Sequence, residues 1–232
     1  MIITEFSDND FEAVEFQNNK HPRIKIDPMY FKLGFSPFSQ IFGRNAILTK
    51  LIQALEFLPE QYGFVVWDVY RPREVQEKLF NWMREEIRSK YPDLTNEENY
   101  TQTQKYMSAP SKIGDEYCPP HLSGGAIDLT LYDITNGNEL EMGTAFDDCS
   151  TKAHSNYYDI KENLLPEEIN IKKSRTILRT AMKKVGFTIY QYEWWHFDMG
   201  NIFWSRNVQK PACFGPLFGD NEWPNEIIEI KL

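Results

Sequence analysis

Two short motifs, His121-Leu-Ser-Gly-Gly-Ala-Ile-Asp128 and Glu193-Trp-Trp-His196, set the strongest limits on how this chain can fold. A catalytic zinc ion usually takes three ligands from His, Asp, Glu or Cys and leaves a fourth position open. His121, Asp128 and His196 can supply these three ligands. The motifs therefore predict a metal site, and segments that are far apart in the sequence must meet there.

The residues between His121 and Asp128 indicate how the first motif folds. Gly124 and Gly125 allow the backbone to turn, so that the two side chains can converge. The stretch 126–131 then alternates apolar and polar residues, which is typical of a strand with one face in a core. Asp128 is therefore expected on the opposite face of that strand, pointing into a cleft.

Glu193 lies three residues before a predicted ligand and is the candidate general base, because it can reach a water molecule at the metal. A single His or Asp is more often a surface or hydrogen-bonded structural residue. The second motif alone fits a buried aromatic strand, but that interpretation leaves the His121 motif unexplained. Cys118, three residues before His121, is an alternative thiolate ligand.

Four motifs in this order resemble a known family. They are Trp67-Asp-Val-Tyr-Arg-Pro72, Gly125-Ala-Ile-Asp-Leu-Thr-Leu131, Met142-Gly-Thr-Ala-Phe-Asp147 and Glu193-Trp-Trp-His196. The chain resembles the zinc D,D-peptidases, and within them the D-alanyl-D-alanine dipeptidase branch. The likeness covers the middle and C-terminal parts of the chain, whereas the first forty residues match weakly.

The resemblance implies a fold, an activity and roles for residues. The fold is α+β, like that of Hedgehog and the D,D-peptidases, with a small antiparallel sheet that carries the metal site and helices packed outside it. The activity is hydrolysis of D-alanyl-D-alanine, or a related D,D-dipeptide, with one Zn²⁺ per chain. Glu193 is then the general base and Arg71 stabilises the oxyanion. Asp147 and Tyr30 are expected to bind the substrate.

Alternative interpretations exist for several of these residues. Arg71 can instead form a surface ion pair with Asp68 or Glu74, and Asp147 can cap a helix or turn. His154 matches a family histidine near the site and is expected outside the ligand set. The sequence also departs from the family pattern, which has Ser-x-His where this chain has Pro119-Pro120-His121. Proline donates no hydrogen bond, so a strict preference for D-Ala-D-Ala is in doubt.

The remaining periodicity gives a coarse map of elements. Helices are expected at 45–57, 72–89 and 166–185, with a shorter one at 96–107 inside a long loop. Strands are expected at 21–26, 63–67, 126–131, 139–142, 187–193 and 196–199. The tail from Asn201 is expected to be irregular and to wrap over the surface.

Length and composition restrict the class of protein. A length of 232 residues favours one domain, spanning 1–232. The net charge of −9 argues against nucleic-acid and anionic membrane partners, which require basic patches. The start lacks the features of a signal peptide, and no apolar stretch is long enough to span a membrane. Three widely spaced cysteines suit reduced thiols in a cytoplasm.

Two further hypotheses compete with a dipeptidase. One is a D,D-carboxypeptidase or endopeptidase that acts on longer peptidoglycan peptides, against which the lack of an export signal argues. The other is a degenerate module that keeps zinc for stability and has no activity. Glu193 distinguishes the last hypothesis, because a structural metal site needs no base. The oligomeric state stays open.

Overall fold

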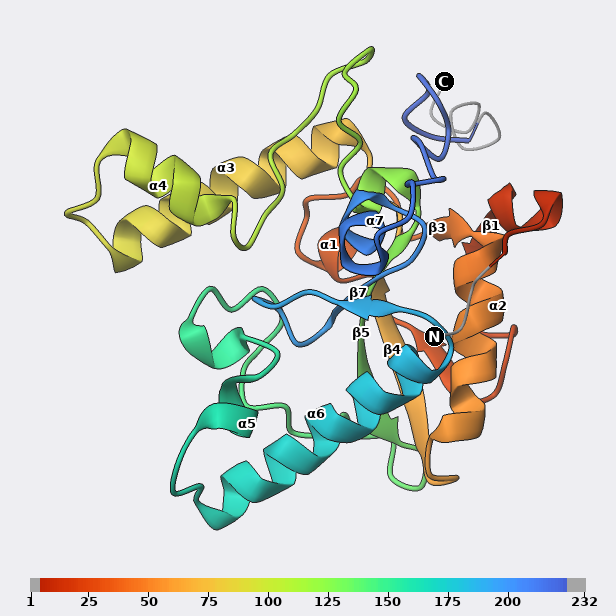
Figure 1. The fold of residues 1–232 in the computed structure, drawn as a ribbon, viewed down its shortest axis with the longest axis vertical. Helices are drawn as coiled ribbons and strands as arrows, with labels where there is room; N and C mark the ends of the chain where they lie inside the picture. The colour runs from red at the N-terminus through yellow and green to blue at the C-terminus, as the bar shows by residue number, and fades with distance from the viewer. Residues whose placement is uncertain (1–4, 225–232) are drawn as a thin grey trace.

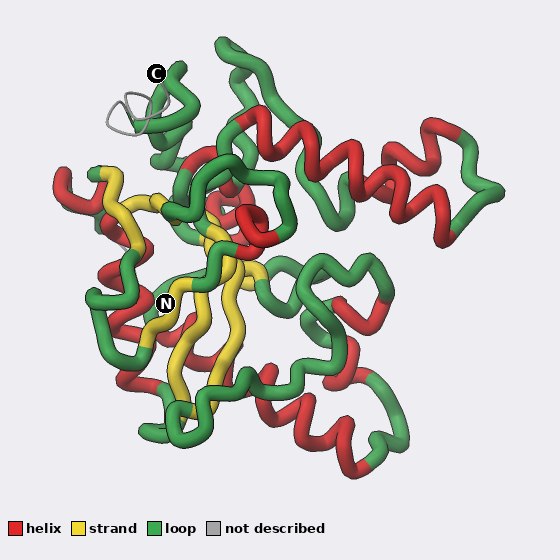
Figure 2. Tube along the Cα trace, turned by 180° about the vertical axis from the view of Figure 1, so that it is seen from behind, coloured by secondary structure: helices red, strands yellow, loops and turns green. Residues whose placement is uncertain are grey.

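A central sheet flanked by helices and long loops organises the chain (Figure 1 and Figure 2). The computed structural model describes residues 5–224. The helices are α1 (Met29–Lys32), α2 (Asn45–Ala54), α3 (Arg73–Lys90), α4 (Asn96–Thr103), α5 (Tyr157–Ile160), α6 (Pro166–Lys184) and α7 (Ile202–Val208). The strands are β1 (Ala13–Phe16), β2 (Ile24–Ile26), β3 (Ile41–Arg44), β4 (Tyr62–Asp68), β5 (Ala126–Asp133), β6 (Thr188–Ile189) and β7 (His196–Asp198).

Five strands form the main sheet in the order β2-β4-β5-β7-β6, and β1 pairs with β3 in a separate antiparallel sheet. The pairs from β4 to β6 are antiparallel, which confirms the expected α+β class. The edge strand β2 departs from the expected antiparallel sheet, because it lies parallel to β4. The long connection through α1, β3 and α2 allows this crossover, since parallel neighbours cannot be joined by a tight turn.

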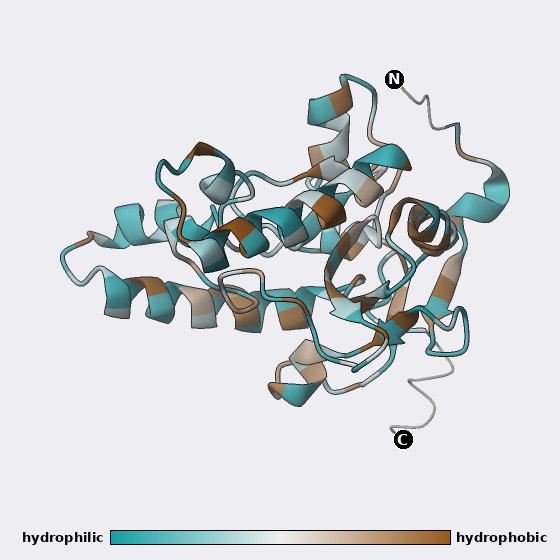
Figure 3. Ribbon diagram, turned by 90° about the horizontal axis from the view of Figure 1, so that it is seen from below, coloured by the Kyte–Doolittle hydropathy of each residue, from teal (hydrophilic) through white to brown (hydrophobic). Residues whose placement is uncertain are grey.

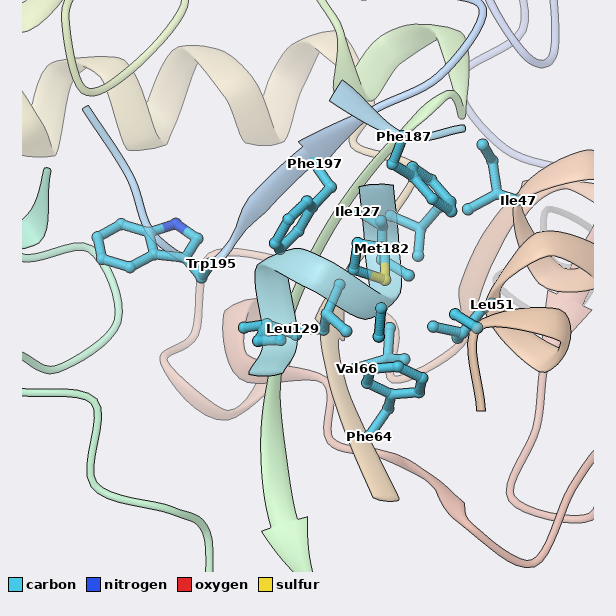
Figure 4. Close-up of a cluster of buried hydrophobic side chains, with 14 of the residues drawn as sticks. Ile47, Leu51, Phe64, Val66, Ile127, Leu129, Met182, Phe187, Trp195 and Phe197 are labelled. Carbon is cyan, nitrogen blue, oxygen red and sulfur yellow. The ribbon is translucent and has the colours of Figure 1, made fainter. Parts of the chain in front are cut away.

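The alternation in β5 separates a core face from a site face. Ile127 and Leu129 are fully buried in the main hydrophobic cluster, together with residues of α2 and α6. Asp128 lies between them and points to the other face, as expected. Figure 4 shows this core with Ile47, Leu51, Phe64, Val66, Met182, Phe187, Trp195 and Phe197.

Helices α3 and α4 form an arm beside the sheet (Figure 1). Pro72 is the N-cap of α3, so the helix begins one residue later than expected. Helix α4 begins with a capping box, in which Thr95 and Glu98 exchange hydrogen bonds, and it ends at Thr103, earlier than predicted. Hydrophobic residues are interspersed with hydrophilic ones along the longer helices (Figure 3), as amphipathic packing requires, whereas α4 consists of hydrophilic residues.

Two predicted strands are wrong in extent. The strand expected at 187–193 is only Thr188–Ile189, because the chain must then turn back to form the antiparallel neighbour β7. Glu193 therefore lies on a turn. The strand expected at 139–142 is reduced to one bridge between Tyr132 and Glu139, since β7 already occupies the adjoining part of that edge of β5.

The tail from Asn201 is more regular than expected, because it begins with α7. The Asn201 side chain accepts hydrogen bonds from the backbone N–H groups of Phe203 and Trp204, at 2.9 and 3.0 Å. This is the usual N-cap of a helix.

Within residues 5–224, the structure contains no helix whose length and apolar character would allow it to cross a bilayer. The expectation that the chain starts without a signal peptide partly concerns residues 1–4, which lie outside the described residues.

Candidate metal centre and active site

The three predicted ligands come together from a turn and two neighbouring strands. His121 opens a 3-10 turn, Asp128 lies in β5 and His196 begins β7. Asp128 and His196 are direct partners across the pair formed by β5 and β7, which lie side by side in Figure 1. Gly124 has a φ of 67°, and this left-handed conformation turns the chain between His121 and β5.

Both histidines have a hydrogen-bond acceptor at the outer ring nitrogen. His121 Nδ1 lies 2.8 Å from the carbonyl oxygen of Val69, and His196 Nε2 lies 3.0 Å from Oδ1 of Asp198. These acceptors favour a proton on each outer nitrogen, so when both rings are neutral the lone pairs of His121 Nε2 and His196 Nδ1 face each other at 3.2 Å. Oxygens of Asp128 lie 3.4 and 3.0 Å from these two nitrogens. A cation relieves the repulsion between such lone pairs, so this buried group could bind a metal ion.

Asp128 is ionised within this group. Burial alone would raise its pKa, but His121 and His196 outweigh burial and hold the pKa of Asp128 below its ordinary value. Metal binding requires the deprotonated carboxylate, and the surroundings of Asp128 supply that form.

Arg71 reaches the same place from the segment between β4 and α3, and its side chain is buried. Its Nε and Nη2 atoms lie 2.9 and 2.8 Å from Oδ2 of Asp68, an oxygen that is also 3.2 Å from His121 Nδ1. Nη2 lies 3.1 Å from the Tyr30 hydroxyl and 3.5 Å from Asp128. The ion pair with Asp68 is thus present, but it is buried beside the metal group and not on the surface. Burial alone would lower the pKa of Arg71, but Tyr30, Asp68 and Asp128 outweigh burial and raise it.

Glu193 lies beside His196, with Oε2 3.7 Å from Nδ1. Burial raises the pKa of Glu193 well above its ordinary value, which makes this carboxylate a stronger base. The Ser155 hydroxyl holds the backbone of the turn that carries Glu193. Its Oγ lies 2.5 Å from the carbonyl oxygen of Tyr190 and 2.9 Å from that of Glu193.

Tyr30 and Asp147 form the other end of the site. The Tyr30 hydroxyl donates to Oδ1 of Asp147 at 3.2 Å. Burial raises the pKa of Asp147 to about 7, although Arg71 opposes this shift. The second oxygen, Oδ2, is buried and has no hydrogen-bond partner among residues 5–224. Buried polar atoms are normally paired, so this oxygen suits a donor that a ligand supplies.

All seven predicted site residues line one pocket. The lining residues that the sequence did not predict are Gln76, Tyr106, Met107, Ser108, Pro119, Pro120, Tyr190 and Phe203. Residues 106–108 belong to the long loop expected at 90–118, so this loop does reach the site.

Cys118, His154 and His21 lie outside the ligand group formed by the described residues. Burial raises the pKa of the Cys118 thiol to about 11, so it carries a proton at neutral pH. His154 Nε2 lies 3.4 Å from the hydroxyl of Tyr106 and does not line the pocket. His21 accepts a hydrogen bond from the backbone N–H of Arg23.

Sequence reasoning missed Asp198, Ser155 and Gln76. Asp198 could have been found, because it follows His196 by two residues in a predicted strand and so shares its face. Ser155 bonds to residues that are distant in the sequence, and Gln76 meets Arg71 through tertiary packing. No local sequence pattern indicates either residue.

Comparison with known proteins agrees with this geometry. A family model described as D-ala-D-ala dipeptidase matches residues 34–211. A D-alanyl-D-alanine dipeptidase of Synechocystis sp. is 29% identical over 216 residues, which cover 84% of this chain and 85% of that protein. The D-alanyl-D-alanine dipeptidase of Enterococcus faecium is 29% identical over 165 residues, covering 68% and 73%. That of Streptomyces coelicolor is 29% identical over 167 residues, covering 69% and 74%.

Proposed function

The chain belongs to the D-Ala-D-Ala dipeptidase family of peptidases, and we propose that it hydrolyses D-alanyl-D-alanine, or a related D,D-dipeptide, to free amino acids with one bound zinc ion. The observation that carries the proposal is the pocket itself. It combines the group that could hold a metal, a buried basic carboxylate and a carboxylate oxygen without a partner.

The spacing of the three candidate ligands supports zinc. Zinc takes His nitrogens and carboxylate oxygens at about 2.0–2.2 Å in tetrahedral geometry, so neighbouring ligand atoms lie about 3.3 Å apart. The two facing nitrogens of His121 and His196 are 3.2 Å apart, and Asp128 offers a different oxygen to each of them, at 3.4 and 3.0 Å. One ligand atom from each of the three residues lies within 4.8 Å of the other two. The three-residue set leaves a fourth position open, as catalytic sites require.

Glu193 is the proposed general base. A bound zinc ion would polarise the scissile carbonyl and lower the pKa of a water molecule to about 7. Glu193 would take a proton from the water that adds to the carbonyl carbon and would deliver it to the leaving nitrogen as the C–N bond breaks. The raised pKa of Glu193 supports this role, because it makes the carboxylate a stronger base than one in water.

Arg71 is the proposed donor to the oxyanion. It is buried, charged and held by Asp68, so its position needs little rearrangement when negative charge develops on the carbonyl oxygen. Its Nη2 lies 3.5 Å from Asp128, which places the guanidinium at the edge of the proposed zinc site.

Asp147 and Tyr30 are proposed to bind the free ammonium of the dipeptide. Asp147 Oδ2 is the unpaired acceptor, and Tyr30 fixes the other oxygen through its hydroxyl. An ammonium supplies the missing donors and favours the ionised form of Asp147, whose pKa of about 7 allows this charge. A blocked substrate lacks that charge.

Pro119 concerns the selectivity for the C-terminal residue of the substrate. It lines the pocket at the position where the family pattern has serine, and it offers no donor. We therefore infer weaker selectivity for the C-terminal residue than that pattern implies.

We also propose that residues 1–232 form one catalytic domain. The family match spans 34–211, and the largest hydrophobic cluster contains residues from Phe16 to Phe214.

The test is hydrolysis by the zinc-loaded protein of L,L, L,D, D,L and D,D dipeptides, of an N-acetylated D-Ala-D-Ala and of a longer peptide that ends in D-Ala-D-Ala. We expect D,D-dipeptides to be cleaved best and the N-acetylated form to lose at least about tenfold in kcat/KM, since a charged hydrogen-bonded pair contributes roughly 1.5–3 kcal/mol. Asp147→Asn should remove most of this difference.

Two outcomes would contradict the proposal. Equal cleavage of free and blocked substrates would favour a D,D-carboxypeptidase or endopeptidase. No cleavage of any peptide would favour a degenerate zinc-binding module. Strict acceptance of D-Ala alone at the C-terminal position would contradict the inference from Pro119.

A further inference from the structure

The neighbours of the Arg71 guanidinium differ in their strength as acceptors. Asp68 accepts from Nε and Nη2, and the Tyr30 hydroxyl lies 3.1 Å from Nη2. Nη1 lies 3.0 Å from Oε1 of Gln76 and 3.1 Å from the sulfur of Met107. A thioether is a weak acceptor. Of the acceptors around the guanidinium, the sulfur of Met107 is therefore the one that a substrate oxygen can replace most readily.

Gln76 has a fixed orientation beside Arg71. Its Oε1 accepts from Arg71, and its Nε2 donates to the backbone carbonyl oxygen of Ser108 at 2.6 Å. The reversed amide would place two donors together at Arg71 and two acceptors together at Ser108, so the hydrogen-bond network determines the orientation. Gln76 is 3% exposed and lies in the first turn of α3, where its N–H bonds to the carbonyl of Pro72 at 3.0 Å. The side chain thus links α3, Arg71 and the loop after α4.

We propose that Gln76 is a positioning residue for Arg71, an inference that rests on the proposed function. Gln76 holds one N–H of Nη1, so the second N–H of the same nitrogen points to the side of the guanidinium where Met107 lies. Through Ser108 it also sets the distance between Met107 and Arg71. Gln76 therefore fixes both the direction of the donor and the adjoining wall of the pocket.

The experiment compares Gln76→Met with the control Asn99→Leu. Methionine has nearly the size of glutamine but lacks the carbonyl acceptor and the amide donor. Asn99 is also fully buried and donates to a backbone carbonyl, that of Arg84 at 3.0 Å, but it joins α4 to α3 away from the pocket. Both variants are assayed with zinc and D-Ala-D-Ala.

For Gln76→Met we expect kcat to fall about 10- to 100-fold with KM changed less than about threefold, because the interaction that Gln76 prepares forms in the transition state. Asn99→Leu should keep both constants. A wild-type kcat in Gln76→Met overturns the proposal. An equal loss of kcat in Asn99→Leu also overturns it, since general loosening of the arm would then explain the effect.

A second measurement is independent of turnover. In protein labelled with ¹⁵N-arginine, we expect the Arg71 Nη–H signals to be resolved in the wild type and averaged by rotation in Gln76→Met. Unchanged signals overturn the positioning role. A wild type that cleaves no dipeptide removes the proposed function, whereas this spectrum still decides whether Gln76 holds the guanidinium. If Gln76→Met does not fold, Gln76→Asn, which is one methylene shorter, replaces it in both measurements.

Discussion

At the residue scale, His121 and His196 each have one nitrogen bonded to a neighbour and one turned toward Asp128. We expect His121→Ala and His196→Ala to weaken zinc binding by more than about 100-fold, which exceeds the 10- to 100-fold effect of changing an outer partner. Competition with a chromophoric chelator measures the affinity. His154→Ala is the control and should bind zinc like the wild type. Full zinc in either ligand variant would show that the ligand set is wrong.

Glu193→Gln separates the base from the metal group. The amide is isosteric, so the fold and the zinc affinity should be kept, whereas kcat should fall about 10²- to 10⁴-fold because the amide cannot accept the proton. Steady-state kinetics and metal titration of the same sample test this pair of expectations. The exposed Glu56 provides the control Glu56→Gln. Wild-type activity in Glu193→Gln would show that Glu193 is not the general base.

Several site residues could be predicted because their own chemistry points to a ligand. His121 and Asp128, with glycines between them, indicated a metal site together with the Glu193-Trp-Trp-His196 motif, and the structure does bring them together with His196. The partners that orient these side chains could not be predicted in the same way. The carbonyl of Val69 and the amide of Gln76 become partners only through tertiary packing.

At the element scale, long periodic segments were predictable and short ones were not. The alternation around Asp128 gave β5, and the amphipathic pattern from Pro166 gave α6. The position of Glu193 was mispredicted, because the sequence continues in strand-like residues while β7 requires the chain to reverse. The parallel edge strand β2 was unpredictable too, since its neighbour is chosen by the whole connection and not by its three residues.

The turn that carries Glu193 should depend on Ser155. We expect Ser155→Ala to lower kcat about tenfold and the free energy of unfolding by roughly 1–3 kcal/mol, because the single O–H group that the carbonyl oxygens of Tyr190 and Glu193 share is lost. Kinetics and urea unfolding measure the two effects, and zinc affinity should stay unchanged. The control is Ser174→Ala, which removes a hydroxyl that bonds only within α6. An unchanged kcat in Ser155→Ala would show that the turn keeps its conformation without the Ser155 hydroxyl.

At the scale of the whole molecule, the buried acids of the site lower the free energy of unfolding. Burial raises the pKa values of Asp68, Asp147 and Glu193. A folded state with raised acid pKa values binds more protons than the unfolded state, so the free energy of unfolding falls as pH rises. For Asp147 this fall spans the interval from about 4, its unfolded value, to about 7.

Asp147→Asn tests this dependence in zinc-free buffer. Asparagine tolerates the left-handed backbone at this position, where φ is 59°. We expect the free energy of unfolding of the variant, relative to that of the wild type, to rise by roughly 2–4 kcal/mol from pH 4 to pH 8, because only the wild type must ionise a buried acid. Urea unfolding at both pH values measures the difference. A constant difference across this range would show that Asp147 does not titrate there.

The outer hydrogen bonds of the two histidines also determine how quickly an ion could escape. A ring tied to Val69 or to Asp198 cannot swing away by itself. Asp128 and His196 are direct partners across the β5–β7 pair, so moving these two ligands apart would require β5 and β7 to separate. Departure would then be a local unfolding event, with a rate set by strand opening and not by the strength of the coordination bonds. A change that speeds the opening of these strands should therefore shorten both the residence time of the metal and the hydrogen-exchange lifetimes of the β7 amides. The concentration of chelator should not alter this relation.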